Sequence, residues 1–294
     1  MRLIPILLIA LTLCSCQPST TSNLKRQTSN HKPQNIKSHT FKKLPVLEYH
    51  KIGYPEGRWT RTPENFRSDL EWLYENGYYP FNFRDILSTF EALPEGKTPV
   101  IITFDDSTSS QFRYLKNGKL DPQCAVGILK SFHEKHPDWP LRATFFVVIE
   151  TNDKDRNLFG QPENPNYQAR KLRQLEEWGM EVGSHTYCHD RLSDVSLEQA
   201  RHQLARASKM LEKNTGRKPV SLALPMGLYP KDLSVLSGKY QRTEYDFKLA
   251  AEVAGGLQPA PWEKGFDPLH IKRIQTIKEE WKKFFGRYRS KRLK

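Results

Sequence analysis

The chain has 294 residues, 37% of them hydrophobic, which is enough to bury a sizeable core and excludes disorder of the whole chain. Its formal net charge of +13 lies in its ends: residues 17–43 and 278–294 each carry +6, Arg2 adds one, and residues 44–277 are neutral. A neutral body argues against a nucleic-acid partner. Basic tails suit an anionic membrane surface or wall polymer, although a solvated tail that only aids solubility explains them equally well.

The N-terminus predicts export. Arg2 precedes an apolar run over residues 3–13, which is shorter than the roughly 20 residues that span a bilayer, so residues 1–15 are expected to be a signal peptide. Residues 13–16, Leu-Cys-Ser-Cys, resemble a bacterial lipobox, which implies cleavage before Cys16 and a lipid on its thiol. An ordinary signal peptide with an incidental cysteine is the alternative. We expect an exported, membrane-anchored lipoprotein of the cell envelope.

Residues 16–43 are rich in Ser, Thr, Asn, Gln and Lys, and predict a disordered tether, because they cannot bury enough apolar surface to offset their ordering entropy. Beyond the tether, Cys124 and Cys188 are too few for a disulfide framework, and the sequence leaves open whether they pair. Scattered tryptophans could line a sugar groove, but isolated aromatics are more often core, so we assign none of Trp72, Trp178, Trp262 and Trp281.

Residues 44–277 alternate short apolar runs with amphipathic stretches. A first strand is expected over residues 44–49, and a helix after Thr62, with the apolar stripe Phe66, Leu70 and Leu73 and a stop at Gly77. Further strands are expected over residues 99–104, 143–149, 180–183 and 220–224. A capping box at Ser196 and Gln199 starts another helix. Six or seven such βα units predict an α/β fold with parallel strands, and favour a barrel over two domains.

Residues 152–167 interrupt this alternation with Asn, Asp, Gly and Pro. They predict either a long loop on the functional rim or a structureless surface insertion.

Two adjacent carboxylates, Asp105 and Asp106, follow the apolar run 99–104. Buried together without a partner they are costly, because like charges raise one another's pKa, and a cation removes that cost. The carboxyl ends of parallel strands converge on the active site, which is where these acids are expected. A turn or a helix cap is the alternative explanation for an Asp pair.

His185 and His189 follow another short strand, and an i, i+4 pair on one helical turn can hold one metal ion. Thr186 stands where a zincin has Glu, so the base must come from elsewhere. One carboxylate of the Asp pair would complete a two-His, one-carboxylate site and the other would act on a water. Cys188 is off the face that the histidines share and is expected to pack rather than to ligate.

These segments resemble the successive signatures of the polysaccharide deacetylase family, carbohydrate esterases with a NodB-type domain. The matching segments are Thr103-Phe104-Asp105-Asp106, Ala143-Thr144-Phe145-Phe146-Val147, Ser184-His185-Thr186-x-x-His189, Tyr49-His50 and Gly77-Tyr78. The resemblance covers residues 44–277 and leaves 278–294 as a basic C-terminal helix or tail. It implies a distorted (β/α) barrel of about seven units and a hydrolase that removes acetyl groups from polysaccharide.

The resemblance also implies roles for particular residues. Asp105 matches the general base, while Asp106, His185 and His189 match the ligands of a divalent metal, Zn²⁺ first, with Co²⁺, Ni²⁺ or Mn²⁺ as alternatives. The backbone N–H of Met226 matches the oxyanion donor. Peptidoglycan or an exopolysaccharide is the implied substrate.

The chain departs from the family pattern at two places. The arginine that usually braces the base aligns with Ala223, so the base is expected either to have another partner or to be less constrained. The late Leu-x-His element that supplies a general acid is missing, because Leu269-His270 has a different spacing, and His50 is another candidate. A catalytically impaired glycan-binding protein on the same fold is therefore the alternative function. A non-haem iron enzyme with the same ligands is disfavoured by the strand–helix alternation.

Overall fold

The computed structural model describes residues 41–286. The expected signal peptide, Cys16, most of the tether and the last eight residues of the chain lie outside this range. Within residues 41–286, no helix combines the length and the apolar character that crossing a bilayer requires.

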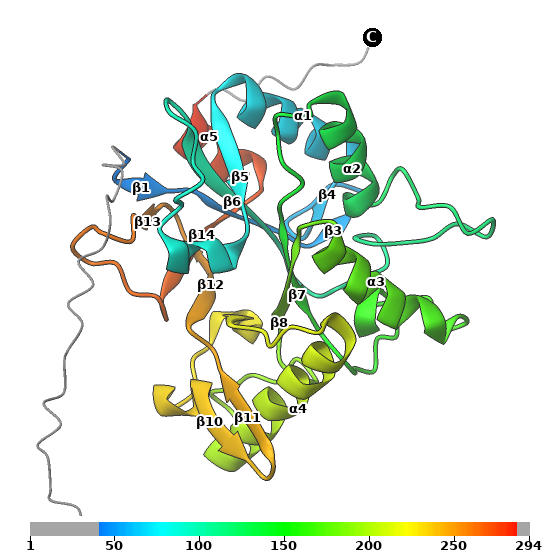
Figure 1. The fold of residues 1–294 in the computed structure, drawn as a ribbon, viewed down its shortest axis with the longest axis vertical. Coiled ribbons are helices and arrows are strands. Elements are labelled where there is room, and N and C mark those ends of the chain that lie inside the picture. Colours follow the sequence, from blue (N-terminus) through cyan, green and yellow to red (C-terminus); the bar gives the residue numbers. More distant parts are fainter. Residues whose placement is uncertain (1–40, 287–294) are drawn as a thin grey trace, which may run out of the picture. The chain divides into compact units, whose positions relative to one another are not determined.

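Seven parallel strands form a closed ring in the described part of the chain (Figure 1). Their order around the ring is β2 (Val46–Tyr49), β14 (Ile271–Gln275), β12 (Leu249–Gly255), β9 (Ser221–Ala223), β8 (Glu181–Ser184), β7 (Thr144–Val147) and β6 (Thr98–Phe104). Pairing of β2 with β6 closes the ring, and β5 (Tyr78–Phe81) pairs with the first half of β6 outside it. The prediction of a parallel (β/α) barrel is confirmed.

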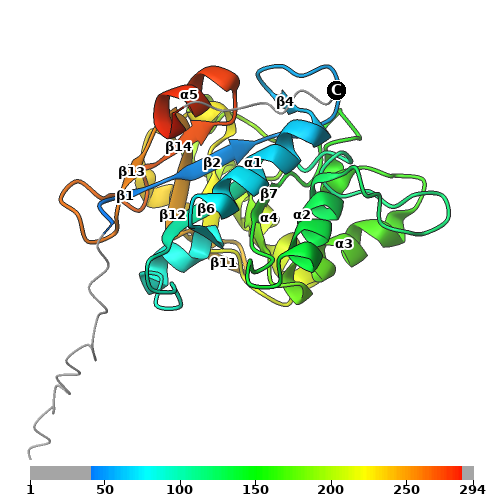
Figure 2. The ribbon, with the colours of Figure 1, turned by 90° about the horizontal axis from the view of Figure 1, so that it is seen from above.

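Helices cover the outside of the ring, as Figures 1 and 2 show for α1 (Pro63–Glu75), α2 (Ala125–Lys135), α3 (Pro165–Glu177) and α4 (Leu197–Thr215). The barrel is distorted because two connections between successive strands of the ring, β9 to β12 and β12 to β14, contain no α-helix. One carries the hairpin β10 (Ser237–Tyr240) and β11 (Thr243–Asp246), and the other carries β13 (Gln258–Pro259), which pairs with β1 (Lys43–Leu44). Four 3₁₀ segments complete the connections: η1 (Phe83–Ser88), η2 (Asn157–Phe159), η3 (Pro225–Gly227) and η4 (Leu233–Leu236).

Local sequence explains where the helices start. The Ser196 hydroxyl accepts from the Gln199 N–H at 3.2 Å while the Gln199 side chain accepts from the Ser196 N–H at 2.9 Å, which is the predicted capping box. The Thr62 hydroxyl caps α1 by accepting from the Asn65 N–H at 3.3 Å. The predicted stripe of α1 is fully buried, and consists of Phe66, Leu70 and Leu73.

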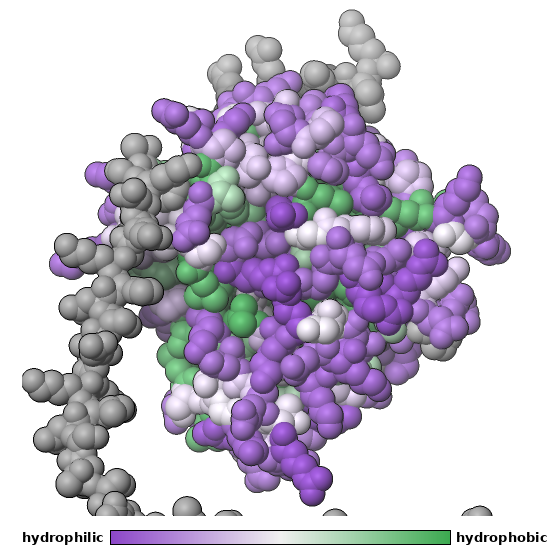
Figure 3. Space-filling model, in the orientation of Figure 1, coloured by the Kyte–Doolittle hydropathy of each residue, from purple (hydrophilic) through white to green (hydrophobic). Residues whose placement is uncertain are grey.

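The C-terminal helix α5 (Lys278–Phe285) packs on the barrel through Trp281, which is 1% exposed and meets the Trp72 ring edge-on at 5.7 Å. Burial of this indole anchors a helix whose polar residues are of both signs, with Glu279 and Glu280 in the first turn and Lys282 and Lys283 in the last. Hydrophilic side chains predominate on the face of the molecule in Figure 3, and apolar ones form smaller patches there. Cys124 is a buried free thiol and Cys188 a partly exposed one, so the two do not pair.

Candidate metal site and catalytic centre

The carboxyl ends of four ring strands deliver the candidate residues to one cavity of about 580 Å³. Asp105 and Asp106 follow β6, His185 and His189 follow β8, His50 follows β2, and Met226 follows β9. All six line the cavity. The structure therefore brings together every catalytic and metal-ligating residue that the sequence singled out, at the end of the barrel where βα loops converge.

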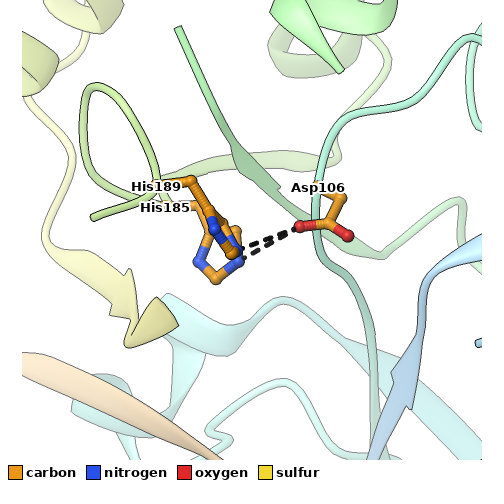
Figure 4. Close-up of side chains that lie close together, drawn as sticks. All are labelled: Asp106, His185 and His189. Carbon is orange, nitrogen blue, oxygen red and sulfur yellow. Dashed lines mark ion pairs between the residues drawn. The ribbon is translucent and has the colours of Figure 1, made fainter. Parts of the chain in front are cut away.

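Asp106, His185 and His189 form a compact group of donor atoms (Figure 4). The Asp106 Oδ1 lies 3.5 Å from the His185 Nε2 and 3.4 Å from the His189 Nε2. One atom from each residue falls within a set whose members are all within 4.8 Å of one another. Two imidazoles and one carboxylate are a donor set that Zn²⁺, Co²⁺, Ni²⁺ and Mn²⁺ all accept, so these residues fit a divalent metal ion.

Both histidines turn Nε2 towards Asp106. The His185 Nδ1 lies 2.8 Å from the Ala223 carbonyl oxygen, so Nδ1 donates to that oxygen and Nε2 is the nitrogen that faces the cavity. Burial, followed by the neighbouring His185, lowers the pKa of His189 to about 3, so this imidazole is neutral at physiological pH. Ala223 therefore supports the site through its backbone, although its side chain cannot replace an arginine.

The segment that carries the histidines is an irregular loop, so the expectation of a helical turn was wrong. Thr186 and His189 both have positive φ, 63° each, and the His189 N–H donates to the Thr186 hydroxyl at 3.0 Å. This side-chain hydrogen bond takes the place of the backbone hydrogen bond of a helical turn. The loop still brings both imidazoles close to Asp106. Positive φ also occurs at Asp106 (79°) and Met226 (57°), as is common where a site fixes an unfavourable backbone.

Asp105 has an arginine partner from elsewhere in the chain, which is the first of the two alternatives that Ala223 left open. Arg273, on β14, is fully buried and donates through Nη1 and Nη2 to the two carboxylate oxygens of Asp105, at 2.7 and 2.6 Å. Burial raises the pKa of Asp105, but the Arg273 charge and its hydrogen bonds outweigh burial, and the pKa is lowered overall. Asp105 is therefore an ionised carboxylate in a fixed orientation, as a general base requires.

Glu48 shares this arginine, with its Oε1 3.0 Å from the same Nη2 that donates to Asp105. Burial, opposed by Arg273 and reinforced by the Asp105 charge, raises the pKa of Glu48 to about 8. One guanidinium thus sits between two buried carboxyl groups, and the proton resides on Glu48 while Asp105 remains charged. The sequence carried a signal for Glu48, which is a charged side chain inside an otherwise apolar strand, but none for Arg273, because β14 also contains Lys272 and Gln275.

The pKa of Glu48 predicts a pH-dependent stability. Because the folded pKa lies above the unfolded value of 4.5, the contribution is complete below pH 4.5 and is lost as pH rises through 8. In metal-free protein, the free energy of unfolding of wild type should therefore fall relative to Glu48→Gln between pH 5 and 9, by at least ~1 kcal/mol. Denaturant titrations of both proteins measure this difference, and parallel curves would contradict the assignment of the proton to Glu48.

The remaining candidates are also placed. Met226 lies in a 3₁₀ turn closed by the bond from the Gly227 N–H to the Leu224 carbonyl at 2.9 Å, and within residues 41–286 its own N–H has no hydrogen-bond partner. His50 borders the cavity with its ring 4.6 Å from that of Trp59, and burial lowers its pKa. The loop over residues 152–164 belongs to the functional rim, since Asp153 and Arg156 line the cavity.

Comparison with known proteins decides the family. A family model described as polysaccharide deacetylase matches residues 92–244. The chain belongs to the polysaccharide deacetylase family. The family prediction and the assignment to the polysaccharide deacetylase class of enzymes, both drawn from the sequence, are thereby confirmed.

Individual relatives of this polysaccharide deacetylase are distant. YxkH of Bacillus subtilis, which is named as a polysaccharide deacetylase, is 22% identical over 242 residues, covering 81% of this chain and 74% of the relative. The peptidoglycan-N-acetylglucosamine deacetylase of Bacillus cereus is 22% identical over 165 residues, covering 56% of this chain and half of the relative.

Solved structures share the fold. The Streptococcus pyogenes deacetylase PplD, solved in complex with acetate, aligns with a TM-score of 0.57 at 22% identity, covering 79% of this chain and 91% of that one. IcaB from Ammonifex degensii gives 0.57 at 20% identity, covering 82% and 94%.

Proposed function

We propose that the protein is a metal-dependent hydrolase that removes acetyl groups from N-acetylated polysaccharide of the cell envelope. The observation that carries this proposal is the pairing of two carboxylates with distinct surroundings at the end of β6. Asp106 faces the two imidazoles, whereas Asp105 faces a buried guanidinium. The two neighbouring acids are therefore suited to different tasks, metal binding for Asp106 and proton transfer for Asp105.

The chain's own groups account for the proton transfers of amide hydrolysis. Asp106, His185 and His189 would hold a divalent cation, with Zn²⁺ as our first choice, which would polarise the acetyl carbonyl and lower the pKa of water. Asp105 accepts the proton of the attacking water, and Arg273 holds the carboxylate in position for it. The free N–H of Met226 donates to the carbonyl oxygen as negative charge develops there.

His50 is the group that we assign to protonate the leaving amine. It borders the same cavity as Asp105, and Glu48, His50 and Asp105 have one polar atom each within a 4.8 Å set. This closeness allows a proton taken up by Asp105 to reach the imidazole during the reaction. The assignment removes the need for a late Leu-x-His element.

The alternative, a catalytically impaired glycan-binding protein, was suggested by the missing arginine and the missing acid. Arg273 contacts Asp105 and His50 borders the cavity, and these two observations support catalysis over binding alone.

Acetate release from N-acetylglucosamine oligomers tests the function. We expect release by wild type and at least about a hundredfold loss in His185→Ala, because that variant removes a metal ligand. His202→Ala is the matched control, since His202 lies on α4, away from the cavity, and should retain the wild-type rate. Metal binding by wild type without acetate release from any acetylated glycan would instead support the glycan-binding alternative.

The location at the envelope is proposed from the sequence alone, on the lipobox-like residues 13–16. Expressed in a bacterial host, wild type should fractionate with membranes and Cys16→Ala should move to the soluble fraction, because the lipid is attached to that thiol. Cys14→Ala is the matched control and should stay with the membranes. Membrane retention of Cys16→Ala would contradict lipidation at this residue.

A further inference from the structure

A cluster of three side chains lies next to the turn that carries Met226. Tyr229 follows that turn, Glu252 lies on β12, and His270 directly precedes β14. The Tyr229 hydroxyl lies 3.2 Å from the Glu252 Oε1, and the His270 Nδ1 lies 3.2 Å from the same oxygen. The rings of Tyr229 and His270 stack with their centroids 4.3 Å apart. Two side chains therefore converge on one carboxylate oxygen, and we call these three residues the Glu252 cluster.

The Tyr229 hydroxyl is a donor in this cluster. Burial, followed by the negative charge of Glu252, raises the pKa of Tyr229, so the hydroxyl keeps its proton at physiological pH. That proton is shared between the Glu252 Oε1 and the Leu269 carbonyl oxygen, which lies 2.8 Å from the hydroxyl. Tyr229 therefore ties the chain that leaves the Met226 turn both to β12 and to the segment before β14.

β12 is irregular at the residue that receives these hydrogen bonds. Its pairing with β14 shifts register between Ala251 and Gly255, so a β-bulge lies there. A bulge leaves backbone groups unpaired with the neighbouring strand, and the Glu252 carbonyl oxygen accepts instead from the Arg273 Nε at 2.5 Å. Glu252 is therefore held through its side chain by the rest of the cluster and through its backbone by the arginine that orients the general base.

The turn that carries Met226 packs on this bulge. The Leu224 N–H donates to the Ala251 carbonyl at 3.1 Å. A Cβ on Gly227 would lie 3.1 Å from the Val253 Cγ2 and 3.2 Å from the Val253 backbone nitrogen, so the turn and the bulge are in close contact. Met226 and Val253 both line the cavity. A shift of the bulge would therefore move the Met226 N–H, although a catalytic donor must keep its position to within about 0.5 Å.

We propose that Glu252 and Tyr229 are positioning residues of the deacetylation reaction, which hold the Met226 N–H where the oxyanion develops. The inference rests on the proposed deacetylase function and adds to it two residues that do not line the cavity. The bulge supports the Met226 turn from one side and Tyr229 fixes the chain that leaves it, so the hydrogen bond between the two side chains completes the support. Because the oxyanion exists only after attack on the carbonyl, loss of this support affects the transition state rather than substrate binding.

Steady-state acetate release from an N-acetylglucosamine oligomer by the Zn²⁺-loaded protein tests the proposal. Tyr229→Phe removes only the hydroxyl, and its kcat should fall about tenfold, less than the roughly 10²- to 10³-fold that follows loss of an oxyanion donor. KM and the affinity for Zn²⁺ should stay close to wild type. Tyr245→Phe is the matched control, because this buried tyrosine on β11 also donates its hydroxyl to a backbone carbonyl, that of Val235 at 2.8 Å, but does not line the cavity. It should keep the wild-type kcat.

Variants of Glu252 show whether the two side chains act together. Glu252→Ala should lower kcat to a similar extent, and Glu252→Gln should retain most of it, because the amide oxygen still accepts from Tyr229. The double variant Tyr229→Phe with Glu252→Ala should lose no more than either single one, since both changes remove one contact.

Three results would overturn the proposal: a wild-type kcat in Tyr229→Phe, whether or not Glu252→Ala folds; losses that multiply in the double variant; or an equal loss in Tyr245→Phe, which would mean that any lost tyrosine hydrogen bond has this effect. Each of these leaves the deacetylase function intact. No acetate from wild type would instead count against that function itself.

Discussion

Replacing Asp105 by Asn should lower kcat by about 10²- to 10⁴-fold, the usual contribution of a positioned general base. The amide has nearly the shape of the carboxylate but cannot accept the proton of the attacking water. The affinity for Zn²⁺ should stay close to that of wild type, because Asp106, His185 and His189 are unchanged. Steady-state acetate release and zinc titration of the same preparation measure the two quantities.

Asp106→Asn is the matched control for Asp105→Asn, because it makes the same chemical change one residue further on. It should lose metal affinity as well as activity, since the Asp106 Oδ1 is the oxygen that faces both imidazoles. If both variants lost metal equally, or if Asp105→Asn released acetate at the wild-type rate, the division of work between the two acids would be wrong.

Replacing Arg273 by Met should destabilise the fold by about 3–5 kcal/mol, because removal of one partner leaves buried charge without compensation. Asp105 and Glu48 are 1% and 2% exposed, so solvent cannot take the place of the guanidinium. The lost charge also raises the pKa of Asp105, because Arg273 is the main influence that lowers it. The acid limb of the pH profile of kcat/KM should therefore move to higher pH.

Arg273→Lys separates charge from geometry, and is informative if the Met variant does not fold. A single ammonium keeps the charge but cannot donate to both carboxylate oxygens, so stability should fall less than in Arg273→Met while kcat still falls. A wild-type pH profile and wild-type kcat in Arg273→Lys would contradict the positioning role of this residue.

Much of the fold could be predicted from local patterns. Apolar runs with β-branched residues marked the ring strands β2, β6, β7, β8 and β9, and the capping box at Ser196 marked the start of α4. The hairpin β10–β11 was missed, because its strands contain few apolar residues and bury only Tyr245. The loop that carries His185 and His189 has no periodic pattern of apolar residues either, so its irregular backbone could not be predicted.

The metal ligands could be predicted from the sequence, but the arginine that orients Asp105 could not. Asp106, His185 and His189 follow predicted strands, and parallel strand ends meet at one edge, so their convergence follows from topology. Arg273 lies 168 residues from Asp105, and no local spacing tells which side chains meet inside a closed barrel. The position of the family's usual arginine aligns with Ala223, whereas the guanidinium that contacts Asp105 belongs to Arg273 on β14.

The most direct test of the account is the acetate released from an N-acetylglucosamine oligomer by chelator-treated wild-type protein as Zn²⁺ is added back. The account predicts negligible release without metal and a rise that saturates near one equivalent of Zn²⁺, because Asp106, His185 and His189 form a single site. Full release by the metal-free protein, with no increase on addition of Zn²⁺, Co²⁺, Ni²⁺ or Mn²⁺, would contradict it.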